Sequence, residues 1–249
     1  MSNSNSAVAG GQIGTRWAAR LAGALIILSY LSYGLPNGIF VQPLVTATDP
    51  LAAIAANGTQ LTVAALLMAI NSAAIIGIAL FLYPIVKRHS ESIALAYVVT
   101  RTFESLVMIA GIIGLLVLVP VSQAAVQGGA ADAATMGALS AFAVHGNAMA
   151  YRIAMISLSV GSIPFCYLLY RARLVPRVLP VLGVVGYLAL STMMVVETLG
   201  GGVDPIVYLL YVPGMLFEIG LACWLLVKGL DTAETSIERA ASFEGEPAE

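Results

Sequence analysis

Charged residues, histidines and cysteines are all scarce in this sequence, and each shortage excludes a class of protein. Only 10% of the 249 residues are charged, whereas 59% are hydrophobic. A soluble domain contains about 25% charged residues. The composition therefore excludes a soluble domain and indicates an integral membrane protein whose main partner is the lipid bilayer. The formal net charge of −2 gives no support for a nucleic-acid partner.

The few histidines and cysteines limit metal chemistry in the same way. The only histidines are His89 and His145, which are too few for a multi-histidine zinc site, and no Cys-x-x-Cys motif is present. We therefore expect no metal site, and no motif specifies a cofactor. Cys166 and Cys223 both fall near the predicted cytoplasmic ends of apolar segments. We expect buried free thiols there and no disulfide.

Six apolar stretches are long enough to cross a hydrocarbon core, which takes roughly 20 helical residues. We place them at residues 17–40, 61–86, 93–121, 147–170, 178–199 and 207–227. The sequence therefore predicts an all-α fold, a bundle of six transmembrane helices over residues 16–230. A polar tail, 1–15, precedes this domain and an acidic tail, 231–249, follows it. The first span carries no cleavage site, so we expect it to be retained.

The basic residues predict the orientation of these spans. The connections 41–60, 122–146 and 200–206 contain no lysine or arginine, while every other connection and both flanks carry them. Lysine and arginine are enriched in cytoplasmic loops. This pattern predicts a multi-pass protein of the cytoplasmic membrane with both termini in the cytoplasm.

The outer connections and prolines give further local predictions. Asp49-Pro50 is a usable helix start and predicts a short interfacial helix in the first outer connection. Residues 132–144 predict either a second interfacial helix or an extension of the fourth span. Pro164 in the fourth span and Pro213 in the sixth each remove one backbone donor, which predicts a kinked helix, and residues 35–38 predict a bend in the first span.

Three charged residues fall inside apolar spans. Arg101 and Glu104 lie in the third span and Glu218 lies in the sixth. A charge at bilayer mid-depth costs roughly 2.5–3.5 kcal/mol on insertion scales, so it tends to persist only where it is paired or functional. Arg101 and Glu104 share one helix face. We expect Arg101 to contact Glu104, Glu218 or both, and an unpaired Glu218 to bind a proton.

A second set of charged or titratable residues lies toward the predicted outer face. His145 and Arg152 are seven residues apart on the fourth span, and Glu197 of the fifth span is a plausible partner for Arg152. Together the two sets predict a polar pocket that reaches from mid-depth to the outer face. Packing is the alternative, because buried charges can hold helices together and interfacial charges can reach the headgroups.

Three parts of the chain resemble one protein family: the Arg101-x-x-Glu104 pair, the run from Cys166 to Gly183, and the segment from Glu218 to Gly229. They are similar to a bacterial family of small polytopic membrane proteins known as domain of unknown function four-three-eight-six. The resemblance covers about residues 16–230. It implies a bacterial inner-membrane protein and implies no activity.

These observations leave three hypotheses about function. The first is a membrane protein that binds or transports a small or lipid-like ligand, with Glu104 and Glu218 as proton- or cation-responsive groups and Arg101 as their counter-charge. A chain of this size that transports could act as a homodimer. The second is an intramembrane enzyme that modifies a lipid or isoprenoid, in which a glutamate acts as acid or base and Arg152 or His145 holds a headgroup. The third is an accessory scaffold subunit.

Overall fold

The structure, a computed structural model, describes residues 3–128, 133–201 and 205–230, and within these ranges the secondary structure is helical. Six helical segments are long and apolar enough to cross a membrane, which confirms the predicted six-helix bundle. They are Thr15–Val45, Gly58–Val86, Glu91–Val126, Ala134–Arg171, Val178–Thr198 and Tyr208–Val227.

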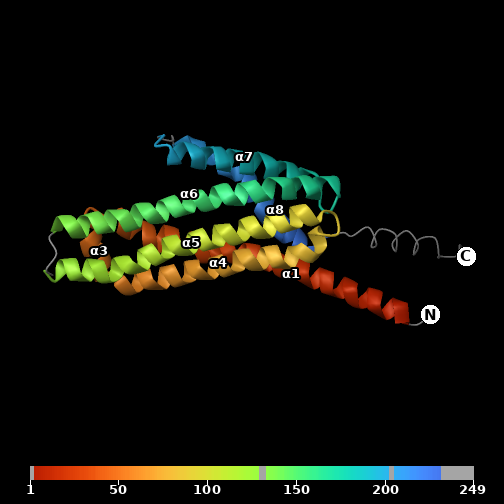
Figure 1. Ribbon diagram of the computed structural model, residues 1–249, viewed down its shortest axis with the longest axis horizontal. Coiled ribbons are helices and arrows are strands. Elements are labelled where there is room, and N and C mark those ends of the chain that lie inside the picture. The colour runs from red at the N-terminus through yellow and green to blue at the C-terminus, as the bar shows by residue number, and fades with distance from the viewer. Residues whose placement is uncertain (1–2, 129–132, 202–204, 231–249) are drawn as a thin grey trace, which may run out of the picture.

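Long α-helices form most of these spans, and short helices complete the first and the sixth (Figure 1). The elements in chain order are α1 (Asn3–Pro36), the π-helix η1 (Asn37–Val41), α2 (Gln42–Val45), α3 (Pro50–Ala56), α4 (Gly58–Val86), α5 (Glu91–Val126), α6 (Ala133–Arg171), α7 (Val178–Thr198), the 3-10 helix η2 (Pro205–Tyr211) and α8 (Val212–Val227).

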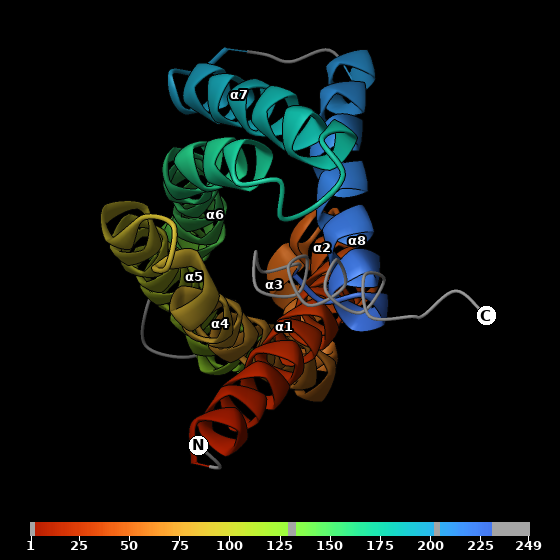
Figure 2. The same cartoon turned by 90° about the vertical axis from the view of Figure 1, so that its right-hand side faces the viewer.

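The six spans form a closed ring in which sequence neighbours are also neighbours in space. Helix α1 packs on α4, α4 on α5, α5 on α6, α6 on α7, and α7 on α8, which returns to α1. Figure 2 shows this ring along the length of the bundle. Because each span contacts mainly its two neighbours, all six share one interior.

The two ends of the ring differ in their basic residues. The α4–α5 and α6–α7 connections lie at one end together with the first residues of α1 (Figure 1). These connections carry Lys87, Arg88, Arg173 and Arg177, and we call this the basic end. The connections at the opposite end contain no lysine or arginine. Helices α5 and α6 extend beyond α7 at that opposite end.

The first connection at the opposite end contains the predicted short helix. The Asp49 carboxylate accepts a hydrogen bond from the Ala52 amide at 3.0 Å and caps α3, whose first residue is Pro50. Ile54 of α3 is fully buried, and the helix packs on α5. In the second connection, helix α6 runs without a break from Ala133 to Arg171, so of the two predicted alternatives the extension of the fourth span is correct. Residues 129–132 lie outside the described ranges.

The proline of the sixth span does not kink a helix, so that prediction was wrong. Helix α8 begins at Val212, and Pro213 therefore lies in its first turn. A backbone donor is not needed in the first turn, and proline is favoured there. Residues 205–211 before it form the 3-10 helix η2. In the first span, the predicted bend coincides with a change from α-helix to π-helix after Pro36.

Small residues set the closest helix contacts. A Cβ added at Gly161 would overlap Thr100 of α5, and one added at Gly186 of α7 would overlap the backbone of Gly214 in α8. Ser157 also donates a hydrogen bond to the Thr100 carbonyl at 3.0 Å. These contacts hold α5 against α6 and α7 against α8.

Candidate functional site

A cavity of about 710 Å³ lies inside the ring and is lined by residues from all six spans. Small-molecule sites usually enclose roughly 300–1,000 Å³. Five of the six residues that the sequence singled out line it: Arg101, Glu104, Arg152, Glu197 and Glu218. The structure therefore brings both predicted charged sets into one space.

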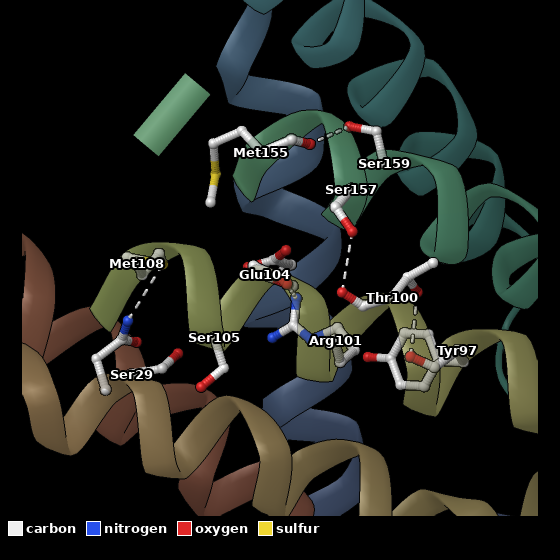
Figure 3. Close-up of polar contacts among 12 residues, drawn as sticks. Ser29, Tyr97, Thr100, Arg101, Glu104, Ser105, Met108, Met155, Ser157 and Ser159 are labelled. Carbon is white, nitrogen blue, oxygen red and sulfur yellow. Dashed lines mark hydrogen bonds and ion pairs between the residues drawn. The ribbon is translucent and has the colours of Figure 1, made fainter. Parts of the chain in front are cut away.

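Arg101 and Glu104 form an ion pair on α5 (Figure 3). An Nη atom of Arg101 lies 3.0 Å from Oε2 of Glu104, and the two side chains are only 8% and 2% exposed. The guanidinium also lies over the Tyr97 ring at 5.9 Å, and Tyr97 stacks on Phe165 of α6 at 4.4 Å. This geometry confirms the predicted pairing and fixes the guanidinium at the cavity wall.

Arg101 keeps hydrogen-bonding capacity that the surrounding protein does not use. A guanidinium has five N–H donors. Among the described residues, the buried Nε of Arg101 and Oε2 of Glu104 make no hydrogen bond, so the ion pair is a charge contact without hydrogen-bond geometry. Buried polar groups in proteins are nearly always hydrogen-bonded, and an exception needs an explanation. The Nη groups of Arg101 also make no hydrogen bond with the described residues and, unlike Nε, are not fully buried, so these are the donors that Arg101 presents to the cavity.

Glu218 is held by two tyrosine hydroxyls and forms no ion pair with Arg101. Tyr30 of α1 donates to Oε2 at 2.7 Å, and Tyr187 of α7 donates to Oε1 at 2.6 Å. Arg101 and Glu104 are near enough to interact with Glu218 electrostatically. Of the predicted alternatives for Arg101, direct contact with Glu104 is the one that forms.

Tyr187 is a site residue that the sequence analysis missed, and Tyr30 was not among its candidates. A simple count could have found both. Tyr30 lies ten residues from Arg20, Tyr187 ten from Arg177, and Glu218 ten from Lys228. Because an α-helix rises 1.5 Å per residue, equal counts from basic residues at the same end indicate a similar depth.

Arg152 and Glu197 form another ion pair among the described residues, as predicted. Nε of Arg152 lies 3.2 Å from Oε2 of Glu197, with the two side chains 29% and 15% exposed. Tyr208 of η2 donates to the other carboxylate oxygen at 3.3 Å. This cluster therefore connects α6, α7 and η2. His145, the sixth candidate, is exposed and does not line the cavity, so its grouping with this set was wrong.

Aromatic and thioether side chains cover the cavity wall between the two charged sets. Tyr33 of α1 stacks on Tyr151 of α6 with ring centroids 5.7 Å apart, and Tyr208 stacks on Tyr211 at 5.7 Å. Four methionines also line the space, namely Met108, Met155, Met194 and Met215. Methionine is flexible and fits irregular apolar shapes. The wall therefore suits a ligand with apolar surface as well as polar groups.

The described residues offer no cluster of metal ligands. That part of the chain contains no group of three or more histidine, cysteine, aspartate or glutamate side chains placed to hold a metal ion. Both cysteines are free thiols; Cys166 is buried, whereas Cys223 is exposed, contrary to the expectation that both are buried.

The chain belongs to the family DUF4386, a domain of unknown function, whose profile matches residues 21–229. This match confirms the family resemblance carried by the Arg101-x-x-Glu104 pair and the two longer segments. No curated protein and no solved structure matches the chain significantly. The family description assigns no activity, so any functional assignment depends on the chemistry of the cavity.

Proposed function

We propose that this protein binds a small or lipid-like ligand in the cavity, as a binding or transport protein of the bacterial cytoplasmic membrane. The observation that carries the proposal is Arg101, whose side chain is 8% exposed, lines a cavity of about 710 Å³ and has Nη donors that make no hydrogen bond with the described residues. A ligand with an acceptor group would supply the missing hydrogen bonds. Arg101 is the contact for that group, and Glu104 is its counter-charge.

A purely structural role explains Arg101 poorly. Arg101 and Glu104 both belong to α5, three residues apart, so their ion pair does not join two helices. A buried ion pair is in any case weak evidence for stability, since apolar residues of similar volume often do as well. The scaffold hypothesis is better suited to Glu218, whose carboxylate connects α1, α7 and α8 through Tyr30 and Tyr187.

An intramembrane enzyme is the second candidate, and the same tyrosine–glutamate cluster favours it. A carboxylate that accepts hydrogen bonds from two hydroxyls within a cavity could act as a general acid or base. Tyr30 and Tyr187 place their oxygens 2.7 and 2.6 Å from Glu218, within proton-transfer reach. Recovery of a ligand with changed mass after incubation would favour the enzyme, whereas recovery of the unchanged ligand would favour binding.

The distribution of basic residues supports the proposed orientation. All lysine- and arginine-bearing connections gather at the basic end, which the positive-inside tendency assigns to the cytoplasm together with both termini. The cavity then extends from the middle of the spans toward the outer side, because Glu197 and Tyr208 of its lining lie near the opposite end.

Native mass spectrometry of the detergent-purified protein tests the proposal. We expect the wild type to retain a molecule of defined mass. Arg101→Lys keeps the positive charge beside Glu104, so it should fold with similar thermal stability. Retention should nevertheless fall by about tenfold or more, because lysine cannot reproduce the forked donors of the guanidinium, and a hydrogen bond to a charged group contributes about 1.5–3 kcal/mol.

Arg20→Lys is the matched control, since it makes the same chemical change at an exposed position of α1 that does not line the cavity. It should leave retention unchanged. If the wild type carries no bound molecule, or if Arg101→Lys retains it fully, the scaffold hypothesis becomes the better explanation.

A further inference from the structure

The exposed part of the cavity lining is confined to two of the six spans. Among the lining residues that the structure describes, those classed as exposed are Tyr30, Gly34, Gln42 and Thr46 on or next to the first span, and Tyr208 and Met215 on the sixth. The described lining residues on α4, α5, α6 and α7 are buried or half-buried. The cavity therefore opens between the first and sixth spans.

The packing of α8 explains this opening. Near the basic end α8 lies against α1, because a Cβ added at Gly23 would be 2.8 Å from the Ala222 carbonyl oxygen and 3.1 Å from the Leu225 Cβ. Farther along, α8 packs instead on α7, where Gly186 meets the backbone of Gly214. Figure 2 shows α8 slanting from α1 toward α7. The seam between α1 and α8 thus widens away from the basic end.

This seam opens at the level of the lipid tails. Tyr30 is the central residue of the span Thr15–Val45, and Glu218 lies at the centre of Tyr208–Val227. Their 2.7 Å hydrogen bond joins the first span to the sixth, so the seam is closed at this level. The opening lies beyond this bond, away from the basic end. An opening that begins midway through a span of about 30 Å faces hydrocarbon first and water only near the end of the span.

We propose that the α1–α8 seam is a lateral entrance for an amphiphile dissolved in the membrane. Its acceptor headgroup, a carboxylate or a phosphate, docks on Arg101, and its apolar chain lies along the tyrosine and methionine wall. This inference rests on the proposed function and adds the class of ligand and its route. A fully water-soluble ligand would need no opening at this depth, and a plain hydrocarbon would leave the Arg101 donors unpaired.

Two glycines allow a matched test of the entrance. Gly34 and Gly38 are both exposed, and an added Cβ at either meets no atom within 4 Å, so both tolerate substitution. Gly34 lines the cavity whereas Gly38 does not. We would introduce Gly34→Cys or Gly38→Cys with Cys223→Ser, since Cys223 is the exposed native thiol, and modify each variant with pyrenyl maleimide.

The probe is a long-chain fatty acid that carries a diazirine in its chain, added to liposomes that contain the full-length protein. After illumination, peptide mass spectrometry locates the adducts. We expect adducts on Met108, Met155 and Met194, which are buried cavity residues. Modification at position 34 should reduce them to background, and modification at position 38 should leave them unchanged. The corresponding diazirine alcohol should give weaker labelling, because it lacks the charge that Arg101 binds.

Other outcomes overturn the inference in distinguishable ways. Undiminished labelling of the methionines after modification at position 34 would exclude this entrance while the cavity remained a binding site. Equal labelling by a short, water-soluble diazirine acid, insensitive to position 34, would identify an aqueous route. Adducts confined to lipid-facing residues in every variant would refute both the entrance and the proposed function.

Discussion

Replacement of Arg101 by leucine is expected to destabilise the protein strongly. The change leaves the Glu104 carboxylate, whose side chain is 2% exposed, without its counter-charge. Removal of one partner of a buried ion pair typically costs about 3–5 kcal/mol, because the remaining charge is uncompensated. For a protein of 150–250 residues, each kcal/mol changes Tm by roughly 2–4 °C, so Tm should fall by roughly 6–20 °C.

The double variant Arg101→Leu/Glu104→Leu isolates the cause. It removes both charges and leaves apolar side chains of comparable volume, and such replacements are often neutral or stabilising. The double variant should therefore recover most of the stability lost in Arg101→Leu. Far-ultraviolet circular dichroism during heating, in one detergent for all variants, would measure the three Tm values.

If Arg101→Leu melts within about 2 °C of the wild type, which corresponds to 1 kcal/mol or less, the pair is not the buried contact described here. If the double variant is as unstable as the single one, loss of Arg101 packing on Tyr97 outweighs the stranded charge.

Two further predictions concern packing and topology. Gly186→Ala should destabilise the protein by about 1–3 kcal/mol, because its Cβ would overlap the Gly214 backbone, whereas Gly34→Ala should not destabilise it. Thermal unfolding in detergent would compare the two variants. Equal Tm values would contradict the tight α7–α8 contact. Cysteines at Asn57 and His89, both exposed, should react with an impermeant maleimide from opposite sides of the membrane, with Asn57 outside; labelling of both from one side would contradict the orientation.

The parts of the structure that the sequence predicted correctly depend on local features. The six spans follow from the length of apolar runs, and the α3 cap follows from Asp49-Pro50. The Arg101–Glu104 pair follows from three-residue spacing on one helix. Each of these needs only the geometry of a single helix, so one sequence is sufficient to predict it.

The missed features depend on how helices rotate and tilt against each other. Tyr30, Tyr187 and Glu218 come from three helices and meet only because α8 crosses from α1 to α7. Hydropathy does not set that crossing; close contacts such as the one at Gly186 do. His145 was grouped with Arg152 by its seven-residue spacing, but it is exposed and lies outside the cavity. A seven-residue spacing aligns residues along a helix but does not show which of them reach the interior of the ring.

A density map of the protein in nanodiscs prepared with its native membrane lipids would test the central claim most directly. We predict connected non-protein density in the cavity, with a headgroup within hydrogen-bond distance of the Arg101 guanidinium and a chain that extends toward the α1–α8 seam. A cavity that holds only separate water molecules bonded to Arg101, with the seam between α1 and α8 closed, would contradict the account.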